Sequence, residues 1–505
     1  MAKKSTPIVE NLPDDTEQLK QIVCELISHL EEKDGQLEDL RGQLQLLLRA
    51  RYGRKAESID AGQLLLFGQQ PTAEPIEESV EPAAEEKVAT GQHGRKKPAR
   101  ELPRTRIIYE LAGSELCCPE CGDKRSKIGE EISEQYDYVP ASVRVIEHVR
   151  CKYACGKCQG NVETAQGAIK PIEKGLAAAG MLAYIATSKF ADHLPLHRLE
   201  SIFKRQGATI SRSTMCDWLS STVSLLEPLY ERMKARVLDS RIVWTDDTPV
   251  NMQDREHERN MREARIWVYI GDEKNPFTVF DFTPSRKRDG PKNFLGDFAG
   301  YLQADAFAGY DCIYAGGNVR EVACMAHARR KFYDAQTSSK RSSLEAQSLI
   351  QSLYAIEKRA ALLSHDERRR VRQVEAKPVL DKFRAWLQEQ RLYSLPKSPI
   401  GKAVGYALNN WTALCEYLTD GELTIDNNRS ERAIRGIAIG RKNWLFAGSQ
   451  DGGHNAAVLS SFIATCKQHK VNPQEYLRDV LTRLGRSEMV DLDRLLPGTW
   501  TPATL

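Results

Sequence analysis

The chain has 505 residues, of which 41% are hydrophobic and 28% are charged, and its formal net charge is +3 from 72 Lys+Arg against 69 Asp+Glu. At roughly 100–200 residues per domain, this length predicts about three or four folded units. The chain lacks the apolar runs of a membrane-spanning helix or a secretory signal, so we expect a cytoplasmic protein without a membrane partner.

Residues 1–60 carry a heptad pattern that favours a coiled coil. Two apolar series repeat every seven residues and lie four positions apart, and Lys33 fills one place of the first series: Leu19, Leu26, Leu40 and Leu47, then Val23, Leu30, Leu37 and Leu44. Such a seam predicts an oligomerisation helix that joins two or three copies of the chain. A single amphipathic helix packed on the rest of the protein is the alternative.

Residues 61–106 are poor in apolar side chains and change sign of charge along their length. Residues 74–87 hold six glutamates and one lysine, whereas residues 94–106 hold six Lys/Arg and one glutamate. This composition predicts a disordered linker that ends in a basic arm, or else a simple solubilising linker. A DNA backbone would attract such an arm, whose candidate contacts are Arg95, Lys96, Lys97 and Arg100.

Residues 107–165 contain six of the twelve cysteines, crowded between Cys117 and Cys158. Two CxxC pairs can converge on one ion and complete a tetrahedral site, so we predict one structural zinc held by Cys118, Cys121, Cys155 and Cys158. Four thiolates leave no open coordination position for catalysis. Cys151 is the substitute ligand if this pairing is wrong, and free thiols are the alternative.

Residues 166–238 have the apolar spacing of helices and resemble a helix-turn-helix. The first helix is expected to end near Gly207, and Ser211 or Ser213 is expected to cap a second helix that exposes Arg212 and Thr214. Many helical hairpins share this pattern, so a packing domain is the competing interpretation.

From residue 239 the pattern changes to strands. Runs of β-branched and aromatic residues predict a β-rich core in two parts, 239–335 and 421–470, interrupted by a helical insertion at 336–420 and followed by a helical tail at 471–505. Strands are expected at 242–250, 264–272, 277–285 and 301–310, with a short one at 444–446. The fold class expected for the whole chain is therefore multidomain α+β.

Three carboxylates recur at positions where strands end or a helix begins. Asp246 is expected to end one strand, Asp305 to end another, and Glu431 to lie in the first turn of a helix capped by Asp426 or Asn427. Carboxylates gathered at one edge of a sheet repel one another unless cations intervene. Two magnesium or manganese ions held by three such acids are a common arrangement for phosphodiester chemistry.

Two neighbours compete with these acids, and each acid alone is more often an ordinary turn residue. Asp247 competes with Asp246 because adjacent strand residues face opposite sides, and Asp311 competes with Asp305. A second group of side chains supplies positive charge near the acids, either for DNA phosphates or for simple solvation: His327, Arg329, Arg330, Lys331, Arg432, Arg435, Arg441 and Lys442.

Several long motifs make the chain resemble the insertion-sequence 66 group of transposases, specifically the large, TnpC-like DDE-type subunit. The resemblance spans nearly the whole chain, and it rests on ARYGRKAESI (50–59), CPECG (118–122), SKFADHLPLHRLESIFKRQG (188–207), SRSTMCDWL (211–219), DDTPV (246–250), ADAFAGYD (304–311), AHARRKF (326–332), IDNNRSERAIRGIAIGRKNWLFAGS (425–449) and LLPGTW (495–500). The family usually has Glu where this chain has Asp247.

This resemblance implies an RNase H-like catalytic core with Asp246, Asp305 and Glu431 as the metal-binding triad. It also implies nicking at transposon ends and strand transfer into target DNA, with the zinc knuckle and the helix-turn-helix binding terminal inverted repeats. Small accessory proteins of the same element and association with the bacterial nucleoid follow from the same likeness. A non-catalytic DNA-binding regulator and a stand-alone RNase H-like nuclease are the competing functions.

Overall fold

The structure is a computed structural model of the chain, and it describes residues 106, 141–153, 163–168, 170–173, 175–485 and 491–502. Contacts divide the chain into two units, one of which, Met1–Lys55 with Val145–Leu505, contains every element discussed below. The heptads, the charged linker and the four predicted zinc ligands lie outside the described residues. No helix in the described ranges is long and apolar enough to cross a bilayer.

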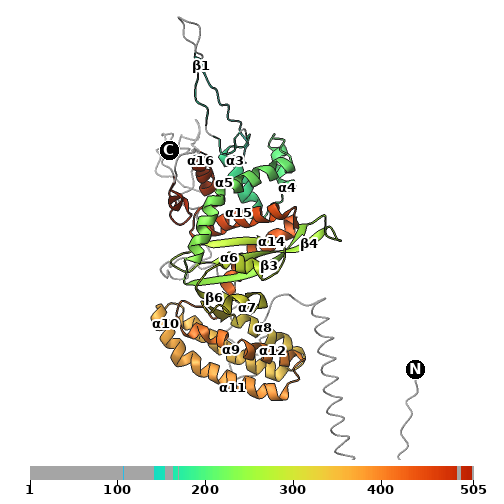
Figure 1. Cartoon of the computed structure of the whole chain (residues 1–505), viewed down its shortest axis with the longest axis vertical. Helices are drawn as coiled ribbons and strands as arrows, with labels where there is room; N and C mark the ends of the chain where they lie inside the picture. Colours follow the sequence, from blue (N-terminus) through green and yellow to red (C-terminus); the bar gives the residue numbers. More distant parts are fainter. Residues whose placement is uncertain are drawn as a thin grey trace, which may run out of the picture. The chain divides into compact units, whose positions relative to one another are not determined.

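A mixed sheet forms the centre of this unit (Figure 1). Its strands lie in the order β5-β4-β3-β6-β7; β3 is antiparallel to β4, β4 to β5, and β3, β6 and β7 run parallel. A further short strand, β8, pairs with the far end of β3. The bounds are β3 (Ile242–Gln253), β4 (Met261–Ile270), β5 (Thr278–Thr283), β6 (Gly300–Ala304), β7 (Val319–Ala323) and β8 (Phe446–Ala447).

Side chains of the central strands are buried on both faces. Trp244, Trp267 and Tyr269 are among the largest fully buried side chains, and neighbouring valines and isoleucines of β3 and β4 are buried with them. Aromatic and β-branched residues suit such pleated, packed surfaces. Helices therefore have to cover both faces of the sheet, and the rest of the chain supplies them.

The edge strand β5 is covered by α15 (Gln450–Gln468). Ser461 Oγ accepts a hydrogen bond from the Phe280 N–H at 2.8 Å, and Thr465 Oγ1 both accepts from the Thr278 N–H at 3.1 Å and donates to its carbonyl at 3.0 Å. These hydroxyls pair with backbone groups that an edge strand otherwise leaves open to another chain. The sheet is thus closed on this side by side chains of a helix.

The N-terminal part of the unit holds a short two-stranded pair, β1 (Lys152–Tyr153) with β2 (Glu163–Thr164), and then three helices: α3 (Ala179–Phe190), α4 (Leu196–Arg205) and α5 (Arg212–Leu238). Gly207 adopts a φ of 85° in the turn between α4 and α5. Ser211 is the N-cap of α5, as predicted, and accepts from the Thr214 N–H. The second helix continues for 27 residues and packs on β5 and α15, so it also belongs to the core.

The helical insertion follows α8 (Met325–Asp334) and ends before α14 (Asn428–Trp444). Its helices pack mainly on one another and on α8. They are α9 (Lys340–Ala360), α10 (His365–Val371), α11 (Lys377–Tyr393), α12 (Pro399–Asn409) and α13 (Trp411–Cys415). Three further helices complete the described elements: α6 (Asp289–Leu295), α7 (Asp311–Tyr314) and α16 (Pro473–Leu484).

The structure confirms the strands predicted at 242–250, 264–272 and 277–285, and it corrects three details. Asp246 does not end its strand, because β3 continues to Gln253 through its pairing with β4. The short strand predicted at 444–446 lies at Phe446–Ala447, because α14 extends to Trp444. The strand predicted at 301–310 ends at Ala304, because the chain turns there into a 3-10 helix at Ala308–Tyr310.

Candidate active site

Asp246 and Asp305 are positioned by neighbouring parallel strands. Pairing between β3 and β6 covers Ile242–Trp244 against Tyr301–Gln303, and β3 meets β8 only from Asn251 onward. Asp246 therefore lies in the interval of β3 that has no partner on this side, and Asp305 comes directly after β6. Each acid lies two residues beyond the last pair of this ladder, Trp244 with Gln303, so the β3–β6 pairing places both carboxylates at the same end.

Glu431 reaches the same place because the start of α14 is attached to β3 and β6. Asn427, the N-cap of α14, is fully buried; its Nδ2 donates to the Thr245 carbonyl at 2.7 Å, and its Oδ1 accepts from Ser430 Oγ at 2.9 Å. Gln303, on β6, donates to the carbonyls of Thr424 and Asp426. The side chain of Asn427 thus fastens the helix to the sheet instead of capping its first turn.

Burial and neighbouring negative charge both act on Asp246. Its pKa is raised to about 7, mainly by burial and further by the charges of Asp305, Asp247 and Glu431, while a hydrogen bond from the Asp247 N–H lowers it. Burial also raises the pKa of Asp305, although the charges of His327 and Arg286 lower it. Carboxylates whose negative charge is this poorly compensated favour binding of a cation.

Asp247, the competing acid, is already fully paired. Its side chain is only 2% exposed; Oδ2 accepts from Arg265 Nη1 at 3.0 Å, and Oδ1 accepts from Nη2 and Nε of Arg286 at 2.7 and 3.0 Å. Asp246 Oδ1, in contrast, accepts a hydrogen bond from the Asp247 N–H at 2.8 Å. Asp247 is therefore a structural ion-pair partner, and Asp246 is the candidate of the two for the site.

The oxygen ligands of Asp246, Asp305 and Glu431 suit a hard divalent cation, but the three side chains are not arranged as a complete metal site. Carboxylate oxygens are the ligands that magnesium and manganese prefer. Within the part of the chain that the structure describes, no three His, Cys, Asp or Glu side chains stand ready as a metal site. Arg286 Nη2 instead lies 3.6 Å from Asp305 Oδ2, so a protein cation is next to one of the three acids.

The predicted cations near the acids take different positions. His327 is half-buried on α8, and its Nδ1 has no hydrogen-bond partner among the described residues. Lys331 Nζ lies 4.6 Å from the ring centre of Tyr406, and Arg441 Nη1 donates to Thr248 Oγ1 at 2.7 Å and to the Pro249 carbonyl. Arg329 is half-buried, and the remaining side chains are exposed: Arg330, Arg432, Arg435 and Lys442.

The other predicted DNA contacts lie away from the acids or outside the described residues. Arg212 is exposed at the start of α5 and pairs with Glu200 of α4 at 3.3 Å. Thr214 Oγ1 is 2.8 Å from Ser211 Oγ, so it takes part in the cap. Arg95, Lys96, Lys97 and Arg100 belong to the part of the chain that is not described.

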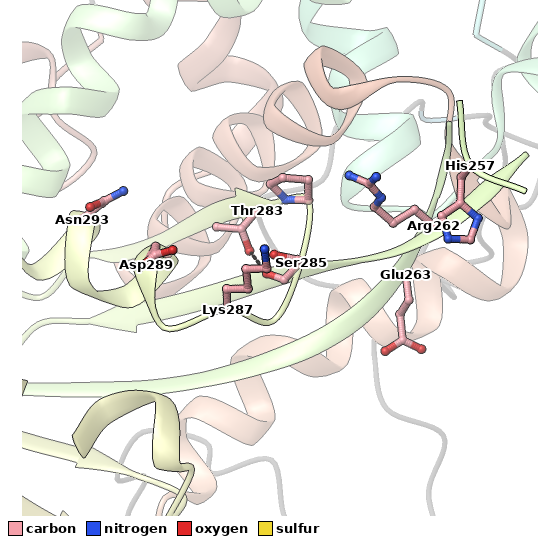
Figure 2. A pocket seen from close by; sticks show the side chains of 10 residues that line it. His257, Arg262, Glu263, Thr283, Ser285, Lys287, Asp289 and Asn293 are labelled. Carbon is pink, nitrogen blue, oxygen red and sulfur yellow. Dashed lines mark hydrogen bonds between the residues drawn. The ribbon is translucent and has the colours of Figure 1, made fainter. Parts of the chain in front are cut away.

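An open groove lies beside the loop that carries Arg286, and Figure 2 shows the side chains that line it. Its walls come from β4 (Arg262 and Glu263), from the end of β5 and the start of α6, and from His257. Asp246, Asp305 and Glu431 do not line this groove. The groove is therefore not the candidate site itself.

Sequence reasoning missed two sets of residues that build this site. Arg265 and Arg286 hold Asp247, and Gln303 and Asn427 hold the start of α14. For Arg286 a signal was present, because Ser285-Arg-Lys-Arg288 directly follows a predicted strand. For Gln303 and Asn427 no local pattern indicated that an amide would be buried.

Comparisons with known proteins agree with this architecture. The model described as "Transposase IS66 family" matches residues 174–455, which include all three acids. A "zinc-finger binding domain of transposase IS66" matches 115–159, an "IS66 C-terminal element" matches 461–497, and "Transposase C of IS166 homeodomain" matches 39–107.

Full-length relatives occur in Sinorhizobium fredii. The protein named "Uncharacterized protein y4jD" is 31% identical over 97% of this chain and 97% of its own length. "Uncharacterized protein y4hP" is 30% identical over 92% of this chain and 87% of its own length. One family model alone covers more than half of the chain. The chain therefore belongs to the IS66 transposase family.

Proposed function

We propose that this protein is a DNA transposase that binds the terminal inverted repeats of an insertion sequence, nicks DNA at its ends and transfers the freed strand to target DNA. The observation that supports the proposal is the placement of three acids that are 59 and 126 residues apart in sequence (305 − 246 and 431 − 305). Asp246 lies on β3, Asp305 directly follows the adjacent parallel strand β6, and Glu431 lies in the first turn of α14, which packs on β3. Family membership supports the same class of reaction.

The proposed catalytic core is RNase H-like. Three antiparallel strands in chain order, β3 to β5, followed by β6 and β7 added in parallel on the other side of β3, support this assignment. The first acid lies on the central strand, the second follows the adjacent parallel strand, and the third lies on a helix packed on the central strand. The sheet thereby holds all three acids on rigid elements.

Two divalent ions, magnesium or manganese, are the proposed cofactors, with Asp246, Asp305 and Glu431 as ligands. When bound, such ions activate the attacking hydroxyl and stabilise the leaving oxygen of a phosphodiester. The protein's own part is to hold the acids: Asn427 and Gln303 fix the start of α14, and burial keeps water from screening their charge. The exposed cations of α14, Arg432, Arg435 and Lys442, are proposed phosphate contacts.

The remaining parts of the chain are proposed to recognise and pair DNA ends. A zinc knuckle of Cys118, Cys121, Cys155 and Cys158, the α4–α5 pair with Arg212 and Thr214, and the basic arm are the proposed DNA-binding elements. His327, Arg329, Arg330 and Lys331 are proposed to contact the DNA strand near the acids, whereas Arg441 is proposed to fix α14 against β3. The heptad segment is proposed to join copies of the chain, and accessory proteins of the element are proposed partners.

A joining assay with the full-length protein tests this function. The substrates are pre-nicked terminal-repeat DNA and a target duplex, in the presence of magnesium, and we expect joined product that disappears when the ions are chelated. Cutting without joining would favour a stand-alone nuclease. Repeat binding with neither cutting nor joining would favour a non-catalytic regulator.

A further inference from the structure

Arg286 makes two unequal contacts beside the candidate active site. It follows β5 by three residues, and its Nε and Nη2 donate to one oxygen of Asp247 at 3.0 and 2.7 Å. Asp247 is almost fully buried, and Arg265 holds its other oxygen. Charge-assisted bonds to a buried carboxylate are strong, so Asp247 is a firm anchor for the guanidinium.

The contact with Asp305 is much weaker. Nη2 lies 3.6 Å from Asp305 Oδ2, which is within ion-pair range but beyond the length of a good hydrogen bond. The Arg286 side chain is 38% exposed, and Nη1 has no acceptor in the described part of the chain. The ring of Phe307 lies 4.1 Å from the guanidinium carbon and supports it from one side. The group can therefore leave Asp305 without leaving Asp247.

Arg286 and a divalent cation compete for the same carboxylate. A guanidinium neutralises part of the charge of Asp305, and it repels a second cation brought to that oxygen. We propose that Arg286 is a displaceable counter-ion of Asp305, which gives way when a divalent metal ion binds and then donates to the phosphodiester held at the site. This inference rests on the proposed function and adds Arg286 to the residues that act in it.

Two consequences separate this role from a merely structural one. Removing the guanidinium abolishes the competition, so divalent ions should bind more tightly. The same removal takes a donor from the phosphodiester, so joining should become slower even when metal saturates the site. A purely structural arginine would instead be expected to weaken metal binding and joining together when it is lost.

The experiment measures binding of Mn²⁺ alone to the full-length protein by the electron paramagnetic resonance signal of free Mn²⁺. For Arg286→Ala we expect binding roughly three- to tenfold tighter than wild type, because one neighbouring positive charge is gone. Arg286→Lys keeps the charge and should stay within about twofold of wild type. Arg288→Ala, with the same charge change two residues away, is the matched control and should also stay close to wild type.

Arg286→Gln serves if Arg286→Ala fails to fold, since glutamine keeps a hydrogen-bond donor for Asp247 without the charge; circular dichroism checks the fold of each variant. Unchanged or weaker Mn²⁺ binding in the neutral variants would overturn the proposal. Unchanged joining at saturating Mn²⁺ would overturn its second half. Wild-type protein that neither binds Mn²⁺ nor joins DNA would instead contradict the proposed function, so the two failures are distinguishable.

Discussion

At the scale of single residues, the partners of a carboxylate decide its chemistry. Asp246 and Asp247 are adjacent on β3, yet two arginines hold Asp247 whereas a backbone N–H is the donor to Asp246. Two arginines offset the negative charge of Asp247, whereas burial disfavours the negative charge of Asp246. The same type of side chain is thus an anchor at one position and a candidate metal ligand at the next.

Asp281 gives a test of buried charge away from the candidate site. Its pKa is raised to about 6, mainly by burial and also by the charge of Glu231, while a hydrogen bond from the Phe282 N–H and the charges of Lys234 and His454 lower it. The folded protein therefore holds this proton more firmly than the unfolded chain does. The contribution of Asp281 to stability is highest below about pH 4 and falls as the pH rises to about 6.

We expect Asp281→Asn to be more stable than wild type above pH 6, by an amount on the order of 2–3 kcal/mol at most, and the difference to vanish near pH 4. Thermal or urea unfolding between pH 4 and pH 8 measures this dependence. Asp297→Asn, at an exposed position, controls for the change of net charge. A difference of the same size at every pH would contradict the explanation.

At the scale of elements, the helical insertion is joined to the chain that leads into α14. Arg372 is 1% exposed and begins the π-helical segment Arg372–Ala376 between α10 and α11. It pairs with both oxygens of Glu357 and donates to the carbonyls of Tyr417, Asp420 and Leu423. The segment after those carbonyls runs directly to Thr424 and Asn427. One buried guanidinium thus links the insertion to the helix that carries Glu431.

We expect Arg372→Met to lower the free energy of unfolding by about 3–5 kcal/mol, because it leaves Glu357 and three carbonyls without their donor. Arg359→Ala removes an exposed pairing with Glu375 from the same two segments and should cost about 1 kcal/mol or less. Denaturant unfolding of both variants makes the comparison. Equal losses would show that Arg372 has no special role.

The sequence predicted elements better than the contacts between them. Ile242 and its neighbours, and the runs around Trp267 and Phe280, indicated strands because β-branched and aromatic residues dominate there. Ser211 indicated a helix start because its hydroxyl can accept a backbone N–H. The pairing of Arg286 with Asp247 had no local signature, since it joins residues 39 positions apart.

The same limit applies to the residues of the candidate site. The sequence led us to expect Asp246 and Asp305 near each other, because parallel strands end at a common edge of a sheet. Arg441 was expected to bind DNA, yet its side chain donates to Thr248 and Pro249 within the chain. The sequence alone does not distinguish a charged side chain that faces solvent from one that joins a helix to a strand.

At the scale of the whole molecule, the net charge of +3 is the sum of segregated parts. A glutamate-rich stretch at 74–87 precedes a basic stretch at 94–106, and acids at the candidate site lie near exposed cations of α14. Near-neutrality overall is therefore compatible with strong local attraction to DNA. Four family models match successive parts of the chain, so the chain is also divided into segments by its relatives.

The central claim is that Asp246, Asp305 and Glu431 act together in joining DNA. The direct test compares wild type with Asp246→Asn, Asp305→Asn and Glu431→Gln in the joining assay, with terminal-repeat binding measured in parallel. We predict that each variant binds the repeats like wild type and loses joining by at least about 100-fold, as expected when one ligand of a two-metal site is removed. Normal joining by any of the three variants would contradict the assignment of that residue, and normal joining by all three would contradict the account.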